Sequence, residues 1–466
     1  MISLSLQITE RKTLLVLGDV FLLNVAVLAG LWLGAQRSGW AFSRVLVIEK
    51  FYWFIGLTAL YLLLAAANDA HSPRRTADLA TSIMALLMTI GEMLLVYLVV
   101  YFLSAPASLP RHVIGFFGVI STGLLLAWRW VYSAVFTAPA FQRRVIIIGA
   151  GWAGQTIARL IRENLAAYFA IAGFVDDDPA KHATQVDGVP VLGGSDSLAR
   201  LVSQVGATDL VLAITHDIRS ELLRAAMTCY EQGVRVLSMQ SLYEQLAQRV
   251  PVEHVGNHWL VVLPVDHNGG RRAYRTLKRF ADVMIALVGL LLFAVLLPIL
   301  AVAIKLGSPG PVLYAQQRVG RGGRVFRLVK LRSMVVDAEP TGGARWAVPN
   351  DARVTRVGRF LRSSRLDELP QLLNVVKGEM SLIGPRPERP EFIAQLEEEI
   401  PFYRTRLAVP PGLTGWAQVN HPYANSVQDA LVKLQYDLYY IKHQSIYLDL
   451  VILLKTVGVM LTMRGT

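Results

Sequence analysis

Four long apolar segments occupy the first third of this 466-residue chain and constrain its fold more than any other feature. They lie at residues 13–35, 46–67, 82–104 and 112–136. Each has about the twenty residues that a helix needs to cross the hydrocarbon core of a bilayer. A buried core helix is the alternative for any one segment, but four in succession indicate four transmembrane helices. The first is not a removable signal peptide, because it lacks a small-residue cleavage site and further spans follow it.

Basic residues next to these segments predict their orientation. Pairs precede the first segment, separate the second from the third and follow the fourth: Arg11 and Lys12, Arg74 and Arg75, and Arg143 and Arg144. Connections rich in lysine and arginine stay in the cytoplasm, so we expect the N-terminus and everything beyond residue 143 there. The single cysteine, Cys229, fits a reducing compartment.

After residue 140 the sequence changes to the pattern of an α/β domain. Apolar runs typical of buried parallel strands occur at residues 145–148, 171–175, 210–214 and 234–237. Gly149, Gly151 and Gly154 follow the first run with the spacing of a dinucleotide-binding loop, and Asp176 ends the second. Nucleotide binding by these four residues is one interpretation. The same glycines also suit a tight strand-to-helix turn, so we predict a Rossmann-like domain over residues 141–268 that is structural, regulatory or dimerising, and we expect no NAD(P).

A fifth apolar stretch, residues 280–305, differs from the first four. Arg279 precedes it, Lys305 closes it and Pro298 lies inside it. Positive charge at both ends favours the cytoplasmic face for both flanks, and proline interrupts a helix. We therefore expect a re-entrant hairpin that enters one leaflet, breaks at Pro298 and returns. A fifth span kinked by proline is the alternative, and it would place the rest of the chain outside the cell.

The C-terminal region is basic and contains two adjacent acids. From residue 271 to the end, 27 lysines and arginines face 15 acidic residues, which accounts for the whole net charge of +12. Such a region suits anionic lipid or phosphorylated substrates, and its membrane tether argues against nucleic acid. Asp367 and Glu368 begin an apolar helical pattern with Arg362 and Arg365 just before them. An ordinary helix N-cap at Asp367 is the alternative to a catalytic pair.

Several motifs of this region occur in a consistent order. They are Lys278-Arg279-x-x-Asp282, Gly310-Pro311, Gln317-Arg318-Val319-Gly320, Lys330-Leu331-Arg332-Ser333-Met334, Leu366-Asp367-Glu368-Leu369-Pro370-Gln371-Leu372, Gly384-Pro385-Arg386-Pro387 and Pro411-Gly412-Leu413-Thr414-Gly415. Together they resemble the bacterial sugar transferase family, the monotopic phosphoglycosyl transferases. The four spans and the Rossmann-like domain are similar to the large members that begin exopolysaccharide or O-antigen assembly. The resemblance implies a transmembrane domain over residues 1–140, an α-rich monotopic catalytic domain over residues 269–466 and a location in the bacterial inner membrane.

The resemblance also implies a reaction. The family moves a hexose 1-phosphate from a UDP-hexose, with glucose or galactose expected here, to undecaprenyl phosphate and releases UMP. Asp367 would be the nucleophile that carries the phosphosugar, and Glu368 together with Asp367 would bind Mg²⁺. The family's pattern also suggests further contacts to phosphate or substrate, at Arg362, Arg386, Arg318, Lys330, Arg332, Asp437 and Asp449.

Two other functions fit parts of the sequence. A membrane-bound nucleotide-sugar dehydratase or epimerase needs a Tyr-x-x-x-Lys pair, and Tyr274-x-x-x-Lys278 has that spacing. A membrane scaffold that binds a nucleotide and anionic lipid is the non-enzymatic alternative, but it leaves the adjacent acids without a role. The expected partners are a UDP-hexose, undecaprenyl phosphate and membrane lipids, with the middle domain as a candidate homodimer surface.

Overall fold

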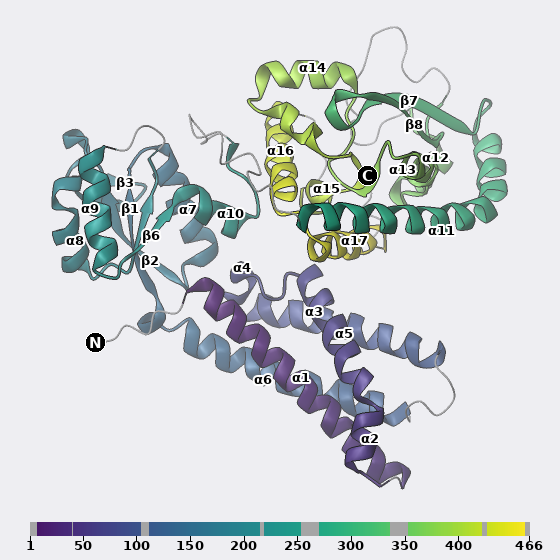
Figure 1. Cartoon of the computed structure of the whole chain (residues 1–466), viewed down its shortest axis with the longest axis horizontal. Helices are drawn as coiled ribbons and strands as arrows, with labels where there is room; N and C mark the ends of the chain where they lie inside the picture. The colour runs from purple at the N-terminus through teal and green to yellow at the C-terminus, as the bar shows by residue number, and fades with distance from the viewer. Residues whose placement is uncertain are drawn as a thin grey trace. The chain divides into compact units, whose positions relative to one another are not determined.

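Two compact units make up the protein. The computed structural model describes residues 7–39, 41–103, 111–214, 219–252, 270–335, 353–421 and 426–461. Contacts between Cα atoms divide the chain into Met1–Leu246 and Ala247–Thr466 (Figure 1). The first unit holds the N-terminal helices together with an α/β sheet. The predicted division into three domains at residues 140 and 268 therefore stays a prediction, and residues 253–269 lie outside the described part of the chain.

Three of the four predicted N-terminal spans are long helices: α1 (Ile8–Ser38), α5 (Leu79–Leu103) and α6 (Arg111–Phe136). The second prediction, residues 46–67, is wrong as a single helix. The chain turns at Lys50, where ψ is 9°, between α2 (Arg44–Glu49) and α3 (Phe51–Ala67). The 17 residues of α3 extend about 25 Å, near the lower limit for a crossing. Among the described residues, the 4 helices long and apolar enough to cross a membrane are α1, α5, α6 and α11 (Gly270–Gly307).

A buried polar cluster joins the helices of the first unit. Asp19 of α1 is 0% exposed, and its Oδ2 atom accepts from Tyr61 Oη at 2.6 Å and from Arg129 Nη2 at 2.6 Å. His71, which precedes the short helix α4 (Pro73–Thr76), lies 2.7 Å from the same oxygen. Charged groups among membrane helices are costly unless they pair, so this cluster favours the observed packing of α1, α3 and α6.

The α/β part of this unit is a six-stranded sheet with the order β3-β4-β2-β1-β5-β6. Its strands are β1 (Arg143–Ile148), β2 (Phe169–Val175), β3 (Gln185–Val186), β4 (Val189–Gly193), β5 (Asp209–Leu212) and β6 (Arg235–Ser238). Its helices are α7 (Trp152–Leu165), α8 (Leu198–Val205), α9 (Ser220–Glu231) and α10 (Met239–Ala247). Neighbours pair in parallel except β3 with β4. This order is that of a Rossmann-like fold, and the four predicted strands are confirmed as β1, β2, β5 and β6.

The second unit combines helices with two small sheets. β7 (Leu313–Val319) and β8 (Val325–Leu331) form an antiparallel hairpin, and β9 (Ser381–Ile383) pairs in parallel with β10 (Gly412–Thr414). The helices after α11 are α12 (Arg356–Ser363), α13 (Leu372–Lys377), α14 (Pro390–Glu399), α15 (Trp416–Asn420), α16 (Val427–Lys442) and α17 (Ile446–Leu461). Two 3-10 turns, η7 (Leu366–Gln371) and η8 (Tyr403–Ala408), connect these elements. The sheets and turns bring together residues that are far apart in the sequence.

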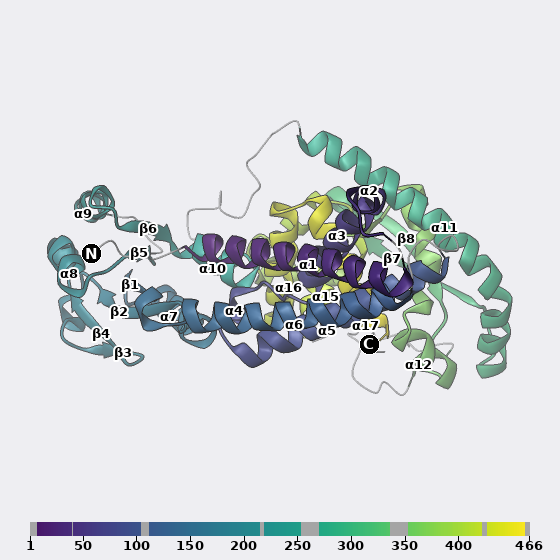
Figure 2. The same ribbon diagram turned by 90° about the horizontal axis from the view of Figure 1, so that it is seen from below.

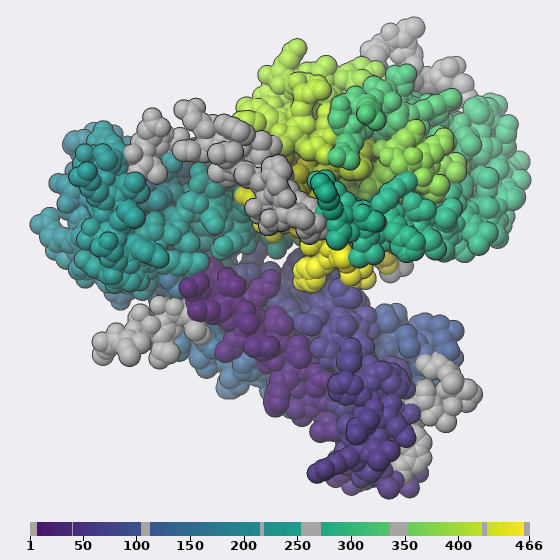
Figure 3. All heavy atoms as spheres, in the orientation of Figure 1, coloured from purple at the N-terminus to yellow at the C-terminus, as the bar shows by residue number. Residues whose placement is uncertain are grey.

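The fifth apolar stretch lies in α11, a continuous helix of 38 residues with Pro298 inside it. Its ribbon changes direction toward its C-terminal end (Figures 1 and 2). Proline lacks a backbone N–H and clashes with the preceding turn, which accounts for a kink where we expected a break. Atoms of α11 lie at the surface of the view in Figure 3. The large exposed apolar side chains of this helix include Phe280, Ile285, Val288, Leu291, Leu292, Val295, Ile299 and Val302. Re-entry into one leaflet stays a prediction.

Candidate active site

The two adjacent acids lie in a tight turn between two helices. After α12 ends, Arg365 has a φ of +56°, a left-handed conformation that costs about 1–2 kcal/mol in a residue with a Cβ atom. The 3-10 turn η7 follows, and α13 begins directly after it. Asp367 is therefore the second residue of a 3-10 turn, and the helix N-cap interpretation is wrong.

Both carboxyl groups are largely buried, and an arginine holds one of them. Asp367 is 7% exposed, and the side chain of Glu368 is 13% exposed. Arg386 donates from Nη2 to Glu368 Oε1 at 2.9 Å. Hydrogen bonds between charged partners are stronger than neutral ones, so Arg386 fixes the position of Glu368.

Four basic side chains from four segments lie close enough to shift the pKa of Asp367 or of Lys330. They are Arg318 of β7, Lys330 of β8, Arg362 of α12 and Arg386, which follows β9. The ammonium group of Lys330 lies 5.4 Å from the centre of the Tyr314 ring, and Arg362 Nε donates to Ser333 Oγ at 3.0 Å. A concentration of cations around two carboxylates is suited to a substrate that carries several phosphate charges.

The surroundings separate the pKa values of the two acids. Burial and the neighbouring Glu368 raise the pKa of Asp367 to about 6, although the nearby cations favour its ionised form. Burial also opposes ionisation of Glu368, but Arg386 and Arg365 outweigh it and hold the pKa of Glu368 below its usual value. Burial, together with the nearby arginines, lowers the pKa of Lys330 to about 8. At pH 7 both acids are therefore mostly ionised while Lys330 is mostly charged.

Two of the predicted substrate contacts, Arg332 and Asp437, bind other groups of the protein. Arg332 donates to the carbonyl oxygens of Ser308 and Pro309, at 2.7 Å each, and so holds in place the segment that follows α11. Asp437 of α16 is 2% exposed and accepts from Arg406 Nη2 at 2.8 Å. Because these partners hold both groups, the assignment of Arg332 and Asp437 to substrate binding stays an untested prediction, and their contacts favour a structural role.

Asp449 of α17 is the centre of another cluster of hydrogen bonds. Its Oδ2 atom accepts from Tyr274 Oη at 2.8 Å and from Lys278 Nζ at 3.0 Å, and its Oδ1 atom accepts from Tyr440 Oη at 2.9 Å. Tyr274 and Lys278 are the pair that the dehydratase alternative requires. Here both bind the carboxylate of Asp449 in the second unit, which explains their spacing without hydride chemistry.

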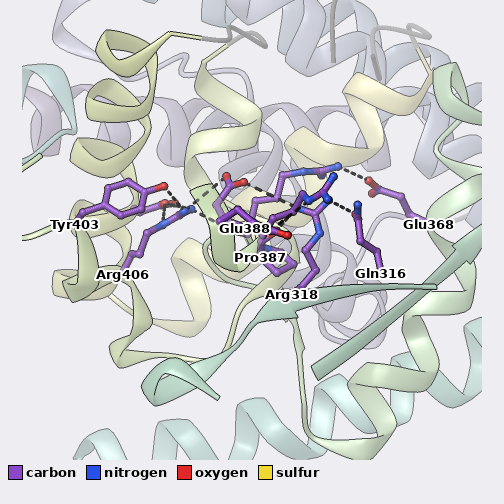
Figure 4. A network of polar contacts seen from close by, with 11 residues as sticks. Gln316, Arg318, Glu368, Pro387, Glu388, Tyr403 and Arg406 are labelled. Atoms are coloured by element: carbon purple, nitrogen blue, oxygen red, sulfur yellow. Dashed lines mark hydrogen bonds and ion pairs between the residues drawn. The ribbon is translucent and has the colours of Figure 1, made fainter. Parts of the chain in front are cut away.

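Arg406, which the sequence did not single out, and Arg318, for which it suggested a phosphate or substrate contact, hold the backbone of the Arg386 segment. Arg406 Nη2 donates to Arg386 O at 3.1 Å, and Arg318 Nη1 donates to Pro387 O at 3.0 Å. Figure 4 shows this network, which includes Tyr403, Glu388 and Gln316. No local pattern marks Arg406, because two of its partners, Arg386 and Asp437, lie 20 and 31 positions away in the sequence.

The two acids have the donor chemistry that Mg²⁺ prefers. Among the residues that the structure describes, no group of three or more histidine, cysteine or acidic side chains is arranged to hold a metal ion. Mg²⁺ commonly uses one or two carboxylates and takes its remaining ligands from water and substrate phosphates. Asp367 and Glu368 fit that pattern, although Arg386 already occupies one oxygen of Glu368.

The glycine loop of the first unit serves backbone packing. Gly149 has a φ of +103°, and a Cβ atom on Gly154 would lie 1.9 Å from Gly149 O. Gly151 has open space around it and precedes α7. The carboxylate of Asp176 accepts from Ala150 N at 2.7 Å and also binds Lys181. These contacts explain two of the three glycines through the fold alone, and nucleotide binding stays a prediction.

Comparisons with known proteins match both units. The family profile described as "Bacterial sugar transferase" matches residues 273–463, and that described as "CoA-binding domain" matches residues 66–240. A UDP-N-acetylgalactosamine-undecaprenyl-phosphate N-acetylgalactosaminephosphotransferase of Aeromonas hydrophila is 39% identical over 70% of this chain and 74% of its own length. A UDP-galactose-lipid carrier transferase of Erwinia amylovora is 32% identical over 70% and 69%. A UDP-glucose:undecaprenyl-phosphate glucose-1-phosphate transferase of Xanthomonas campestris pv. campestris is 31% identical over 67% and 66%.

Proposed function

The chain belongs to the bacterial sugar transferase family, and on this basis we propose that it transfers a sugar 1-phosphate from a UDP-sugar to undecaprenyl phosphate and releases UMP. The observation that carries the proposal is the buried pair Asp367 and Glu368 among the cations of four separate segments. The named relatives act on glucose, galactose and N-acetylgalactosamine, so the candidate sugars extend beyond the two hexoses first expected.

We propose that Asp367 acts as the nucleophile. In the first step an oxygen of its carboxylate attacks the phosphorus that bears the sugar, and the bond from this phosphorus to the UMP oxygen breaks. UMP leaves, and the phosphosugar remains on Asp367 as an acyl phosphate. In the second step an oxygen of undecaprenyl phosphate attacks the same phosphorus, and Asp367 is released. Such covalent catalysis divides one difficult transfer into two easier ones.

The neighbouring side chains support both steps. Arg386, Arg362 and Lys330 all act electrostatically on Asp367, so in this mechanism they would stabilise the charge that develops on the phosphoryl oxygens. Arg386 keeps Glu368 ionised and in place, ready to share an ion with the substrate phosphates. Mg²⁺ bound there would neutralise phosphate charge and favour the departure of UMP.

The exposed apolar surface of α11 suits a membrane-embedded base for this site. We propose that α11 enters the cytoplasmic leaflet of the bacterial inner membrane and returns, with its kink near Pro298. Both soluble UDP-sugar and the phosphate of a membrane lipid could then reach Asp367 from the cytoplasmic side. Scanning accessibility of single cysteines along α11, with Cys229 replaced by serine, tests this topology. Labelling of both ends from the cytoplasmic side is expected, whereas periplasmic labelling of one end would contradict it.

A screen for UMP release tests the function directly. The purified full chain is incubated with undecaprenyl phosphate, Mg²⁺ and, one at a time, UDP-glucose, UDP-galactose and UDP-N-acetylgalactosamine. We expect UMP with at least one of them, and loss of nearly all turnover when EDTA removes the ion. UMP release that is unchanged by EDTA would contradict the role given to Mg²⁺, and no UMP with any UDP-sugar would contradict the function.

The pKa values of Asp367 and Lys330 predict a bell-shaped pH profile. Asp367 gains a proton as the pH falls through about 6 and then cannot attack phosphorus. Lys330 loses its charge as the pH rises through about 8. We therefore expect kcat/KM for the UDP-sugar to be highest near pH 7 and to fall on both sides. In the control variant Lys330→Arg the basic limb should move to higher pH, and an unchanged basic limb would exclude Lys330 as its source.

A further inference from the structure

The motif Lys278-Arg279-x-x-Asp282 of α11 has no role in the reaction described above. Two of its side chains, Arg279 and Asp282, contact two chain segments that lie between Glu368 and Arg386 in the sequence: residues 375–376 and residues 381–382. Residues three apart in a helix lie on the same face, so one turn of α11 faces both segments.

Arg279 binds the end of the segment that carries the acids. Its Nη1 and Nη2 atoms donate to the carbonyl oxygens of Val375 at 2.6 Å and Val376 at 2.9 Å. Carbonyl groups in the last turn of a helix lack helical partners, and a basic side chain can satisfy them. Because α13 follows η7 directly, Arg279 fixes the helix onto which the turn of Asp367 and Glu368 leads.

A second close approach joins the same elements. A Cβ atom on Gly289 would lie 2.7 Å from Leu372 Cδ1, the first residue of α13. α11 therefore contacts α13 at its start as well as at its end, so α13 has little freedom to shift along or away from α11.

Asp282 binds the segment that leads to Arg386. It is 5% exposed and accepts from Ser381 Oγ at 2.7 Å and from Leu382 N at 3.3 Å. Both partners belong to β9, and Arg386 lies three residues after the end of that strand. On its other side β9 pairs with β10, and Gly412 N donates to Pro385 O at 2.8 Å. Asp282 thus ties the Arg386 segment to α11.

We propose that Arg279 and Asp282 are positioning residues for sugar-phosphate transfer. From one turn of α11 they hold the acid-bearing and arginine-bearing segments at the separation at which Arg386 reaches Glu368. The inference rests on the proposed function. It gives α11 a second role besides anchoring, because its N-terminal half binds both α13, which follows the acid pair, and β9, which leads to Arg386.

The test compares Asp282→Ala with Tyr274→Phe. Tyr274→Phe also removes a hydrogen bond of α11, but this bond joins α11 to Asp449 rather than to β9. The variant therefore controls for general loosening of the helix. Small displacements of reacting groups lower turnover strongly. Asp282→Ala is therefore expected to reduce kcat about 10-fold or more while KM for the UDP-sugar changes less than about 3-fold, and Tyr274→Phe should stay within about 2-fold of the unchanged protein. Asp282→Asn should recover part of kcat, since its amide oxygen can still accept from Leu382 N.

Hydrogen exchange gives a readout that does not depend on activity. Asp282→Ala should speed amide exchange in residues 381–386, and Arg279→Met should do so in residues 372–378, with Tyr274→Phe affecting neither. An unchanged kcat in Asp282→Ala, or an equal loss in Tyr274→Phe, would overturn the inference. If the unchanged protein released no UMP, the proposed function would fail, and unaltered exchange in both variants would independently reject the positioning roles.

Discussion

Asp367→Asn is expected to reduce UMP release by about 10⁴-fold or more, because the amide that replaces the carboxylate cannot form the acyl phosphate. Asparagine has nearly the same shape, and Glu368, Arg386 and the turn around them stay in place. The binding of UDP-sugar should therefore change little while turnover is lost. The measurement is a single-turnover assay of UMP with excess enzyme, together with intact-mass analysis after acid quenching for an added sugar phosphate.

The control for this variant is Glu397→Gln on α14. Glu397 is 42% exposed and pairs with Arg404, and exposed ion pairs contribute little to stability. Its turnover should equal that of the unchanged protein. A normal burst of UMP from Asp367→Asn, or the same mass adduct on it, would show that the phosphosugar does not pass through this aspartate.

The sequence singled out Asp367 and Glu368 because adjacent acids among many basic residues are chemically unusual and suggested phosphate chemistry. In the structure Arg386 binds Glu368, and Lys330 is close enough to influence the pKa of Asp367, while the catalytic role of the pair stays a prediction. The conformation of the turn was not predictable in the same way. Arg365 adopts a left-handed backbone that single-sequence patterns assign to glycine or asparagine, so the 3-10 turn was interpreted as a helix start.

Predictions were weaker where a residue's role depends on distant partners. The family's pattern suggested a phosphate or substrate contact at Asp437, but tertiary structure places it against Arg406, 31 residues away. The cluster at Asp19 was missed for the same reason, since its partners come from three other segments. In the fold, β3 was missed because it has only two residues, and β4 because Pro190 interrupts its apolar run, whereas the buried runs of β1 and β2 were found.

Asp437→Leu is expected to destabilise the second unit by about 3–5 kcal/mol, because it leaves the buried guanidinium of Arg406 without its closest counter-charge. For a unit of this size that loss corresponds to a fall of about 6–20 °C in its unfolding midpoint. Thermal unfolding of the purified full chain, monitored by the fluorescence of Trp416 in a variant whose other tryptophans are phenylalanine, measures the shift.

The double variant Asp437→Leu with Arg406→Met separates a structural role from substrate binding. Replacing both members of a buried pair by apolar side chains removes the unpaired charge, so most of the lost stability should return. Turnover should stay reduced, since Arg406 also donates to the carbonyl oxygen of Arg386 and the double variant lacks that bond. If Asp437 instead contacted substrate, the single variant would raise KM for the UDP-sugar while keeping its unfolding midpoint. That result would return Asp437 to the binding site and leave Arg406 with Glu388, 3.6 Å away, as its sufficient partner.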